Sequence, residues 1–409
     1  MALVRSPWQQ PQKSWTITTA AKTIFLSSRS VFILMVVAFV WYSTGLFGDE
    51  QVSGVSLPLP SCPTTWSSGK QDYFSFLCED PAVSYLQISP PSSSTTLPRP
   101  RILCLVLTHS NNHATRMKAV VETWGRKCDI LIGASNVTDP LLHTFDVESS
   151  SSHTGYWGIW DKLMHTLQRI VENKEFPQPL DYDWILKADD DTYVIMENLQ
   201  AFLANISQQH SSSLLSAEPR IYGRTMAWPR YKRFQDMEGW FPKHSENYNF
   251  GQRFYAKLGM EETLRFSHGG PGYIMNRGYV ETLVQVYFNT TTTATTTNSG
   301  EGGSDAIKGQ VAEDIANAVT MLYHGIRPRS TFDLDSGRER MHPESPQTMF
   351  ANPIWLEKMH HGIKGSLTGP GEQCCSPTSI SFHYVADFQM RLLEYQLYHC
   401  PRETTKNKK

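Results

Sequence analysis

Three consecutive carboxylates, Asp189-Asp190-Asp191, come directly after the mostly apolar stretch 184–188. An apolar run that ends abruptly in acids predicts a buried strand that carries the acids at its carboxyl end. Ligands bind at that edge in open α/β sheets. Because neighbouring carboxylates repel one another, a divalent cation is the simplest explanation, and oxygen ligands suit Mg²⁺, Mn²⁺ or Ca²⁺. The alternative is an acidic turn that caps the next helix.

A second pair of acids, Glu313 and Asp314, lies in the first turn of a helix predicted over residues 312–323. Acids at this position interact favourably with the helix dipole, which explains the pair without any function. The functional interpretation is a carboxylate that takes a proton from a substrate hydroxyl.

A histidine near the end of the chain is the candidate third metal ligand. In the stretch 380–385, strand alternation places Phe382 and Tyr384 on one face and His383 on the other. An imidazole on a strand would complete an oxygen-rich metal site, and the alternative is an ordinary polar residue.

Two further segments have compositions suited to ligands. Residues 267–275 hold three glycines in four positions, which lets the backbone approach a ligand closely, but no Gly-Lys-Ser/Thr follows as in a Walker loop. Residues 221–255 interleave rings with cations, which suits a nucleotide or sugar and equally suits a partly exposed loop. Its rings and cations include Tyr222, Arg224, Trp228, Arg230, Tyr231, Lys232, Arg233, Trp240 and Phe241.

The elements that must position these residues alternate between strands and helices. Continuous apolar runs predict strands over 101–109 and 129–133, with a helix over 115–124 between them. Apolar residues repeat at helical spacing over 156–171, and another helix-like run covers 390–398. This order predicts an α/β fold with a mixed, mostly parallel sheet flanked by helices.

The composition limits the class of protein. With 409 residues, 40% of them hydrophobic, the chain can bury one large core or two small ones. A formal charge of -2 gives no sequence-wide attraction to nucleic acid, so no nucleic-acid partner is expected.

The N-terminal region predicts a membrane anchor. Residues 31–47 form an uncharged run of about 17 residues, the short limit for a membrane-spanning helix. Cations precede the run and acids follow it, so 1–30 is expected to be cytoplasmic and the rest lumenal. The runner-up is a cleaved signal peptide. Residues 48–100, rich in Ser, Pro and Thr, are interpreted as a stem, 101–400 as the folded domain and 401–409 as a tail.

All seven cysteines follow the apolar run, in a compartment where disulfides persist. Cys104 and Cys128 fall near two neighbouring strands, where we expect a disulfide, with two buried free thiols as the alternative. The adjacent Cys374 and Cys375 do not form a zinc pattern. Three glycosylation sequons and a Thr/Gly-rich insertion over 289–303 add weak evidence for a lumenal glycoprotein.

Taken in order, these motifs resemble the core 1 β1,3-galactosyltransferases, glycoprotein-N-acetylgalactosamine 3-β-galactosyltransferases related to the fringe enzymes. The resemblance covers roughly 101–399. Any one motif is weak, and the order makes the set specific. The motifs are Ile102-Leu103-Cys104 with Thr108, Glu122-Thr123-Trp124-Gly125-Arg126-Lys127-Cys128, Leu186-Lys187-Ala188-Asp189-Asp190-Asp191-Thr192-Tyr193, Gly269-Gly270-Pro271-Gly272-Tyr273, Glu313-Asp314, His360-His361-Gly362-Ile363-Lys364-Gly365, Cys374-Cys375-Ser376 and Ser381-Phe382-His383-Tyr384-Val385.

The resemblance implies a type II Golgi membrane protein with a GT-A fold that uses UDP-galactose and Mn²⁺ to build Gal-β1,3-GalNAc on Ser or Thr of glycoproteins. By position, Asp189, Asp191 and His383 would hold Mn²⁺, and Asp314 would be the base in an inverting displacement. A homodimer is among the assemblies that it allows. The residues that it places at the donor are Leu107, Thr108, Arg116, Lys187, Asp189, Asp190, His383 and Tyr384.

Three departures from the family pattern indicate a divergent member. The aromatic segment that usually precedes Cys-Cys-Ser is reduced to 366–373, the Lys-Thr usually found after Trp-x is not found after Trp157, and Ser267 replaces a common cysteine. The acceptor is therefore the least determined part of the reaction. Two alternatives remain: a fringe-like β1,3-N-acetylglucosaminyl transfer, and a lumenal binding or folding-helper protein without catalysis.

Overall fold

The computed structural model describes residues 78–90, 99–147, 158–173, 180–209, 218–227, 241, 243, 245–258, 264–288, 305–309, 311–351 and 369–400. The predicted anchor at 31–47, most of the stem, the insertion at 289–303 and residues 228–240 of the aromatic and cationic segment lie outside these ranges. Within the ranges described, no helix is long and apolar enough to cross a membrane.

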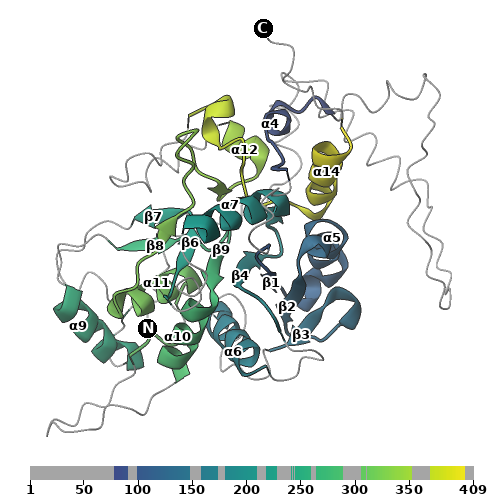
Figure 1. Ribbon diagram of the computed structural model, residues 1–409. Helices are drawn as coiled ribbons and strands as arrows, with labels where there is room; N and C mark the ends of the chain where they lie inside the picture. Colours follow the sequence, from purple (N-terminus) through teal and green to yellow (C-terminus); the bar gives the residue numbers. More distant parts are fainter. Residues whose placement is uncertain are drawn as a thin grey trace, which may run out of the picture. The chain divides into compact units, whose positions relative to one another are not determined.

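A seven-stranded sheet forms the centre of the described structure (Figure 1). Four of its six strand pairings are parallel, and β9 runs antiparallel to both of its neighbours. This confirms the predicted α/β class with a mixed, mostly parallel sheet. The strands in spatial order are β10 (Arg329–Ser330), β6 (Ile221–Gly223), β9 (Tyr273–Asn276), β4 (Trp184–Asp189), β1 (Ile102–Leu107), β2 (Ile130–Ser135) and β3 (Thr144–Asp146).

Helices cover both faces of this sheet, which explains why β1 is apolar throughout. Its alternate residues belong to different cores: Leu103 and Leu105 to one, Ile102 and Cys104 to the other. The first core includes α6 (Ile159–Glu172), α9 (Glu246–Leu258), α10 (Arg277–Phe288) and α11 (Glu313–Tyr323). The second includes α5 (Lys118–Glu122), α7 (Met196–Gln209) and α14 (Asp387–Tyr398).

Strand register brings the predicted functional residues to one edge. β1 pairs with β4 so that Leu107 lies opposite Asp189, and both strands end there. After Asp191 the chain forms β5 (Tyr193–Val194), which pairs with β12 (Ser381–Phe382) beside β11 (Met341–His342). Strands β7 (Thr225–Ala227) and β8 (Arg265–Ser267) form a separate two-stranded antiparallel sheet. The segment Gly269-Gly270-Pro271-Gly272, called the glycine turn below, connects β8 to β9.

Two predicted elements differ from those observed. The helix expected over 115–124 is a π-helical turn (His113–Met117), α5 and a 3-10 turn (Trp124–Lys127). The strand expected over 380–385 ends at Phe382, because Tyr384 takes a left-handed conformation with φ of 52°. The backbone N–H of Val385 then donates to the carbonyl of Asp191, so strand alternation does not extend to Tyr384, which is 60% exposed.

Residues 78–90, which we assigned to the stem, instead pack on the domain. Helix α4 (Pro81–Ser84) brings Val83 into the second core with Leu86, and Cys78 forms a disulfide with Cys400. Helix α12 (Pro346–Phe350) lies against α4. The disulfide expected between Cys104 and Cys128 is present, and Cys374 pairs with its neighbour Cys375.

Candidate functional site

Two of the three consecutive acids converge with the predicted histidine. The Nε2 atom of His383 lies 3.1 Å from Oδ1 of Asp191 and 3.8 Å from Oδ2 of Asp189. One ligand atom from each side chain lies within 4.8 Å of the others. Two carboxylates and an imidazole are a donor set that Mn²⁺ accepts. These residues therefore fit a divalent metal.

The glycine turn determines where the His383 ring can lie. A Cβ atom on Gly270 would lie 2.4 Å from Nδ1 of His383, so the imidazole occupies space that only glycine leaves open. Burial lowers the pKa of His383, but the hydrogen bond to Asp191 and the charge of that carboxylate outweigh it and raise the pKa. The same contacts lower the pKa of Asp191 against its burial. These contacts favour the protonated imidazole, and a metal ion that binds Nε2 would displace that proton.

The side chain of Asp190 contacts different residues from those that Asp189 and Asp191 contact at His383. Its carboxylate accepts hydrogen bonds from Thr108 Oγ1 at 2.7 Å and Asn112 Nδ2 at 2.8 Å, and Arg116 Nη1 lies 3.4 Å away. Its backbone N–H donates to the carbonyl of Leu107. Burial raises the pKa of Asp190 against these hydrogen bonds. Asp190 therefore fastens the end of β4 to the segment after β1.

Arg116 contacts two of the three acids and is partly exposed to solvent. Its guanidinium contacts Asp190 and also Asp191, at 3.3 Å, while its side chain stays 43% exposed. It lies in the π-helical turn, a feature that often marks functional sites. An exposed guanidinium can bind an anion, and the assignment of Arg116 to the donor site stays a prediction.

Lys187 is buried beneath the site, with 1% of its side chain exposed. Its ammonium group contacts Oδ1 of Asp189 at 2.8 Å, Oε2 of Glu313 at 3.1 Å and the carbonyl of Gly269 at 3.2 Å. Three acceptors use all three N–H bonds of the ammonium. The geometry therefore gives Lys187 a supporting role in place of the donor contact that the resemblance implied.

Asp314 lies in the first turn of α11, next to the same glycine turn. Its Oδ2 accepts from the N–H of Gly269 at 3.1 Å and its Oδ1 from the N–H of Ile315 at 2.9 Å. Burial, followed by the charge of Glu313, raises the pKa of Asp314 to about 6. A base of this pKa is largely ionised at neutral pH and can still take up a proton.

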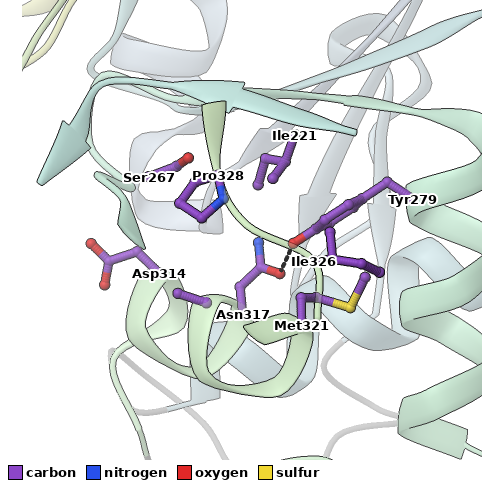
Figure 2. A pocket seen from close by; sticks show the side chains of 9 residues that line it. Ile221, Ser267, Tyr279, Asp314, Asn317, Met321, Ile326 and Pro328 are labelled. Carbon is purple, nitrogen blue, oxygen red and sulfur yellow. Dashed lines mark hydrogen bonds between the residues drawn. The ribbon is translucent and has the colours of Figure 1, made fainter. Parts of the chain in front are cut away.

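A small cavity lies behind this carboxyl group (Figure 2). Its volume is ≈ 10 Å³, about that of one water molecule. Ser267, Asn317 and Tyr279 contribute to its lining, and the hydroxyl of Tyr279 donates to Asn317 at 2.7 Å. The cavity is too narrow to hold a sugar.

The other predicted residues lie at the same edge or next to it. Thr108 follows β1 and contacts Asp190, and the exposed ring of Tyr384 lies 4.0 Å from the His383 ring, centroid to centroid. The shortened segment after Gly365 is described from residue 369 onward only.

Lys162 is a residue that our sequence reasoning missed. It lies on α6, is 6% exposed, and its ammonium donates to the carbonyl of Thr108 at 3.0 Å. The sequence does contain a signal for it. Lys162 lies two residues after Trp160, so the Trp-x-Lys spacing that is not found after Trp157 is present after Trp160.

Comparison with known proteins identifies the family. A family model described as Fringe-like matches residues 98–328, more than half of the chain. The chain belongs to the Fringe-like family. This Fringe-like protein is also 27% identical over 305 residues to glycoprotein-N-acetylgalactosamine 3-beta-galactosyltransferase 1 of Xenopus laevis. That alignment covers 73% of the chain and 66% of the relative. Together the two matches confirm the resemblance drawn from the motifs.

Among solved structures, a crystal structure of an active-site mutant of LgtC aligns with 74% of this Fringe-like protein and 98% of the LgtC chain. The sequence identity is 11% and the TM-score 0.30, an overlap too loose to argue from.

Proposed function

We propose that the protein is an inverting β1,3-galactosyltransferase with a GT-A fold. In this proposal it transfers galactose from UDP-galactose to O3 of GalNAc linked to Ser or Thr. The observation that supports this proposal is that the candidate metal ligand and the candidate base lie on the same glycine turn. Gly270 packs against His383, and the N–H of Gly269 donates to Asp314. The family and the named relative supply the chemistry of donor and acceptor.

The proposed reaction is a single displacement. The acceptor hydroxyl oxygen attacks the anomeric carbon as the bond from that carbon to UDP breaks, and UDP leaves with the electron pair. Asp314 takes the hydroxyl proton. Its two oxygens each accept one backbone hydrogen bond, which fixes the carboxylate and leaves lone pairs for the incoming proton. Attack opposite to the leaving group converts an α-linked donor into a β-linked product.

Asp189, Asp191 and His383 would hold Mn²⁺, which neutralises the negative charge of the departing UDP. Arg116 offers a further cation to the donor phosphates from its exposed position. Asp190 keeps Thr108 and Arg116 in place at the donor side.

Two alternatives stay distinct. The Fringe-like match is equally consistent with transfer of N-acetylglucosamine, because it does not fix which sugar the donor carries. A non-catalytic binding or folding-helper protein is disfavoured by the buried acids, because a protein without the reaction gains nothing from keeping them together. We also propose a type II membrane topology, which residues 31–47 predict, and a Golgi location, which the family resemblance implies.

The deciding experiment measures transfer from labelled UDP-galactose and UDP-N-acetylglucosamine to a GalNAc-α-peptide, with and without Mn²⁺. The full chain should be used, because residues 78–90 pack on the domain. We expect Mn²⁺-dependent transfer of galactose. Transfer of N-acetylglucosamine alone would favour the fringe-like reaction, and no transfer from either donor would overturn the enzymatic proposal.

A further inference from the structure

Next to the proposed metal ligand Asp189, the side chains of Lys187 and Glu313 form a buried row of charges. The proposed reaction does not use these two side chains directly. Lys187 lies between two carboxylates, Asp189 at 2.8 Å and Glu313 at 3.1 Å. Glu313 also accepts a hydrogen bond from the hydroxyl of Tyr273, and its side chain is 7% exposed. The ammonium and the second carboxylate are therefore both withdrawn from water.

The orientation of Asp189 depends on this chain of contacts. Its Oδ1 accepts from Lys187, and its Oδ2 is the oxygen that faces His383. One oxygen is thus held by the protein while the other remains for a ligand. The conformation of Glu313 is held too, because Oε2 contacts Lys187 and Oε1 accepts from the hydroxyl of Tyr273.

Charge balance explains why a second carboxylate is needed. A lone buried ammonium beside Asp189 would neutralise that carboxylate and repel a divalent cation. With Glu313 present, the Lys187–Glu313 pair is neutral, so the charge of Asp189 stays available to the metal.

We propose that Glu313 is a positioning residue for the metal site: it neutralises Lys187, which lets Lys187 orient Asp189 without weakening its attraction for a divalent cation. This rests on the proposed function in that it assigns Asp189 to the metal. It adds a role for the acid that precedes the base, beyond the helix-dipole interaction considered from the sequence.

The test measures Mn²⁺ affinity in the full-length protein, titrating Mn²⁺ in the presence of UDP and following the electron paramagnetic resonance signal of free Mn²⁺. We expect Glu313→Gln to weaken Mn²⁺ binding about tenfold or more, the usual range for residues that support a metal ligand. Lys187→Met/Glu313→Gln removes the uncompensated cation and should recover most of this loss. Glu313→Asp should bind Mn²⁺ more tightly than Glu313→Gln.

Glu394→Gln is the matched control. Glu394 is also a buried glutamate, which accepts from the hydroxyl of Tyr193 at 2.7 Å and pairs with Arg126 at 2.8 Å. Its substitution should leave Mn²⁺ affinity unchanged. If Glu313→Gln does not fold, the double variant still tests the idea, because it should fold and bind Mn²⁺ nearly as wild type does.

The outcomes separate this inference from the proposed function. Wild-type Mn²⁺ affinity in Glu313→Gln, or equally weak binding in the single and double variants, overturns the positioning role even if the wild-type protein transfers galactose. The expected order of affinities in a protein that transfers no sugar supports the positioning role and overturns the proposed reaction.

Discussion

At the scale of single residues, Asp314 is the group on which the proposed chemistry depends. Asp314→Asn keeps the shape of the side chain and removes the base, so we expect transfer to fall by about 10²–10⁴-fold. UDP binding should be nearly unchanged, because the carboxylate of Asp314 is held by Gly269 and Ile315, which are not metal ligands. Radiometric transfer and calorimetric UDP binding measure the two effects. A near-normal transfer rate would show that another group is the base.

The raised pKa of Asp314 predicts a pH dependence. The ionised form is active, so kcat/KM should fall as the pH drops below about 6, where this carboxyl group becomes protonated. The slope should approach about tenfold per pH unit, measured with saturating Mn²⁺. The residual activity of Asp314→Asn should lack this acidic limb. An acidic limb centred near pH 4 would contradict the assignment.

Asp191 is the acid that lies closest to His383, and we expect its loss to weaken the binding of Mn²⁺ and UDP directly. Asp191→Ala removes a carboxylate 3.1 Å from the imidazole and should weaken Mn²⁺-dependent UDP binding by more than about tenfold. UDP titrations with and without Mn²⁺ measure this. Equal loss in both titrations would instead indicate a general disruption of the donor site.

At the scale of elements, the glycine turn between β8 and β9 joins the metal side to the base side. Gly270→Ala should displace His383, because its Cβ would lie 2.4 Å from Nδ1, and should reduce Mn²⁺-dependent UDP binding. Gly337→Asn is a suitable control, because Gly337 has a φ of 69° that asparagine tolerates and a Cβ atom there would meet nothing within 4 Å. Unchanged Mn²⁺ dependence in Gly270→Ala would show that the ring has room to move.

The strands that carry the site were predictable because each contains a continuous apolar run that ends abruptly in polar or acidic residues. The apolar runs became β1 and β4, and the parallel register placed Asp189 at the predicted edge. Asp189, Asp191 and His383 meet as expected. Pattern and edge rules were sufficient here because β1 and β4 are central strands with both faces covered.

Features that depend on partners distant in sequence could not be predicted in this way. Lys187 looked like a donor contact, but Glu313 and Gly269 occupy its ammonium group. Tyr384 leaves the expected strand face because the backbone N–H of Val385 bonds to Asp191. The role of Asp190 likewise depends on Thr108 and Asn112, which a motif of three acids does not reveal.

At the scale of the whole domain, the Cys78–Cys400 disulfide joins residues separated by 322 positions in sequence. Replacing both cysteines by serine should lower the free energy of unfolding by about 2–5 kcal/mol, since the unfolded chain regains the freedom of a long loop. Thermal unfolding of the double variant beside wild type measures the loss. An unchanged melting temperature would mean that packing of α4 alone holds this segment.

The same bond makes the domain a covalently closed ring. A protease that cuts once anywhere between Cys78 and Cys400 leaves both fragments attached, so the nicked protein migrates as a single chain until it is reduced. During synthesis, the ring can close only after Cys400 has emerged and can reach Cys78. Closure of the ring therefore requires that all of residues 78–400 have been synthesised.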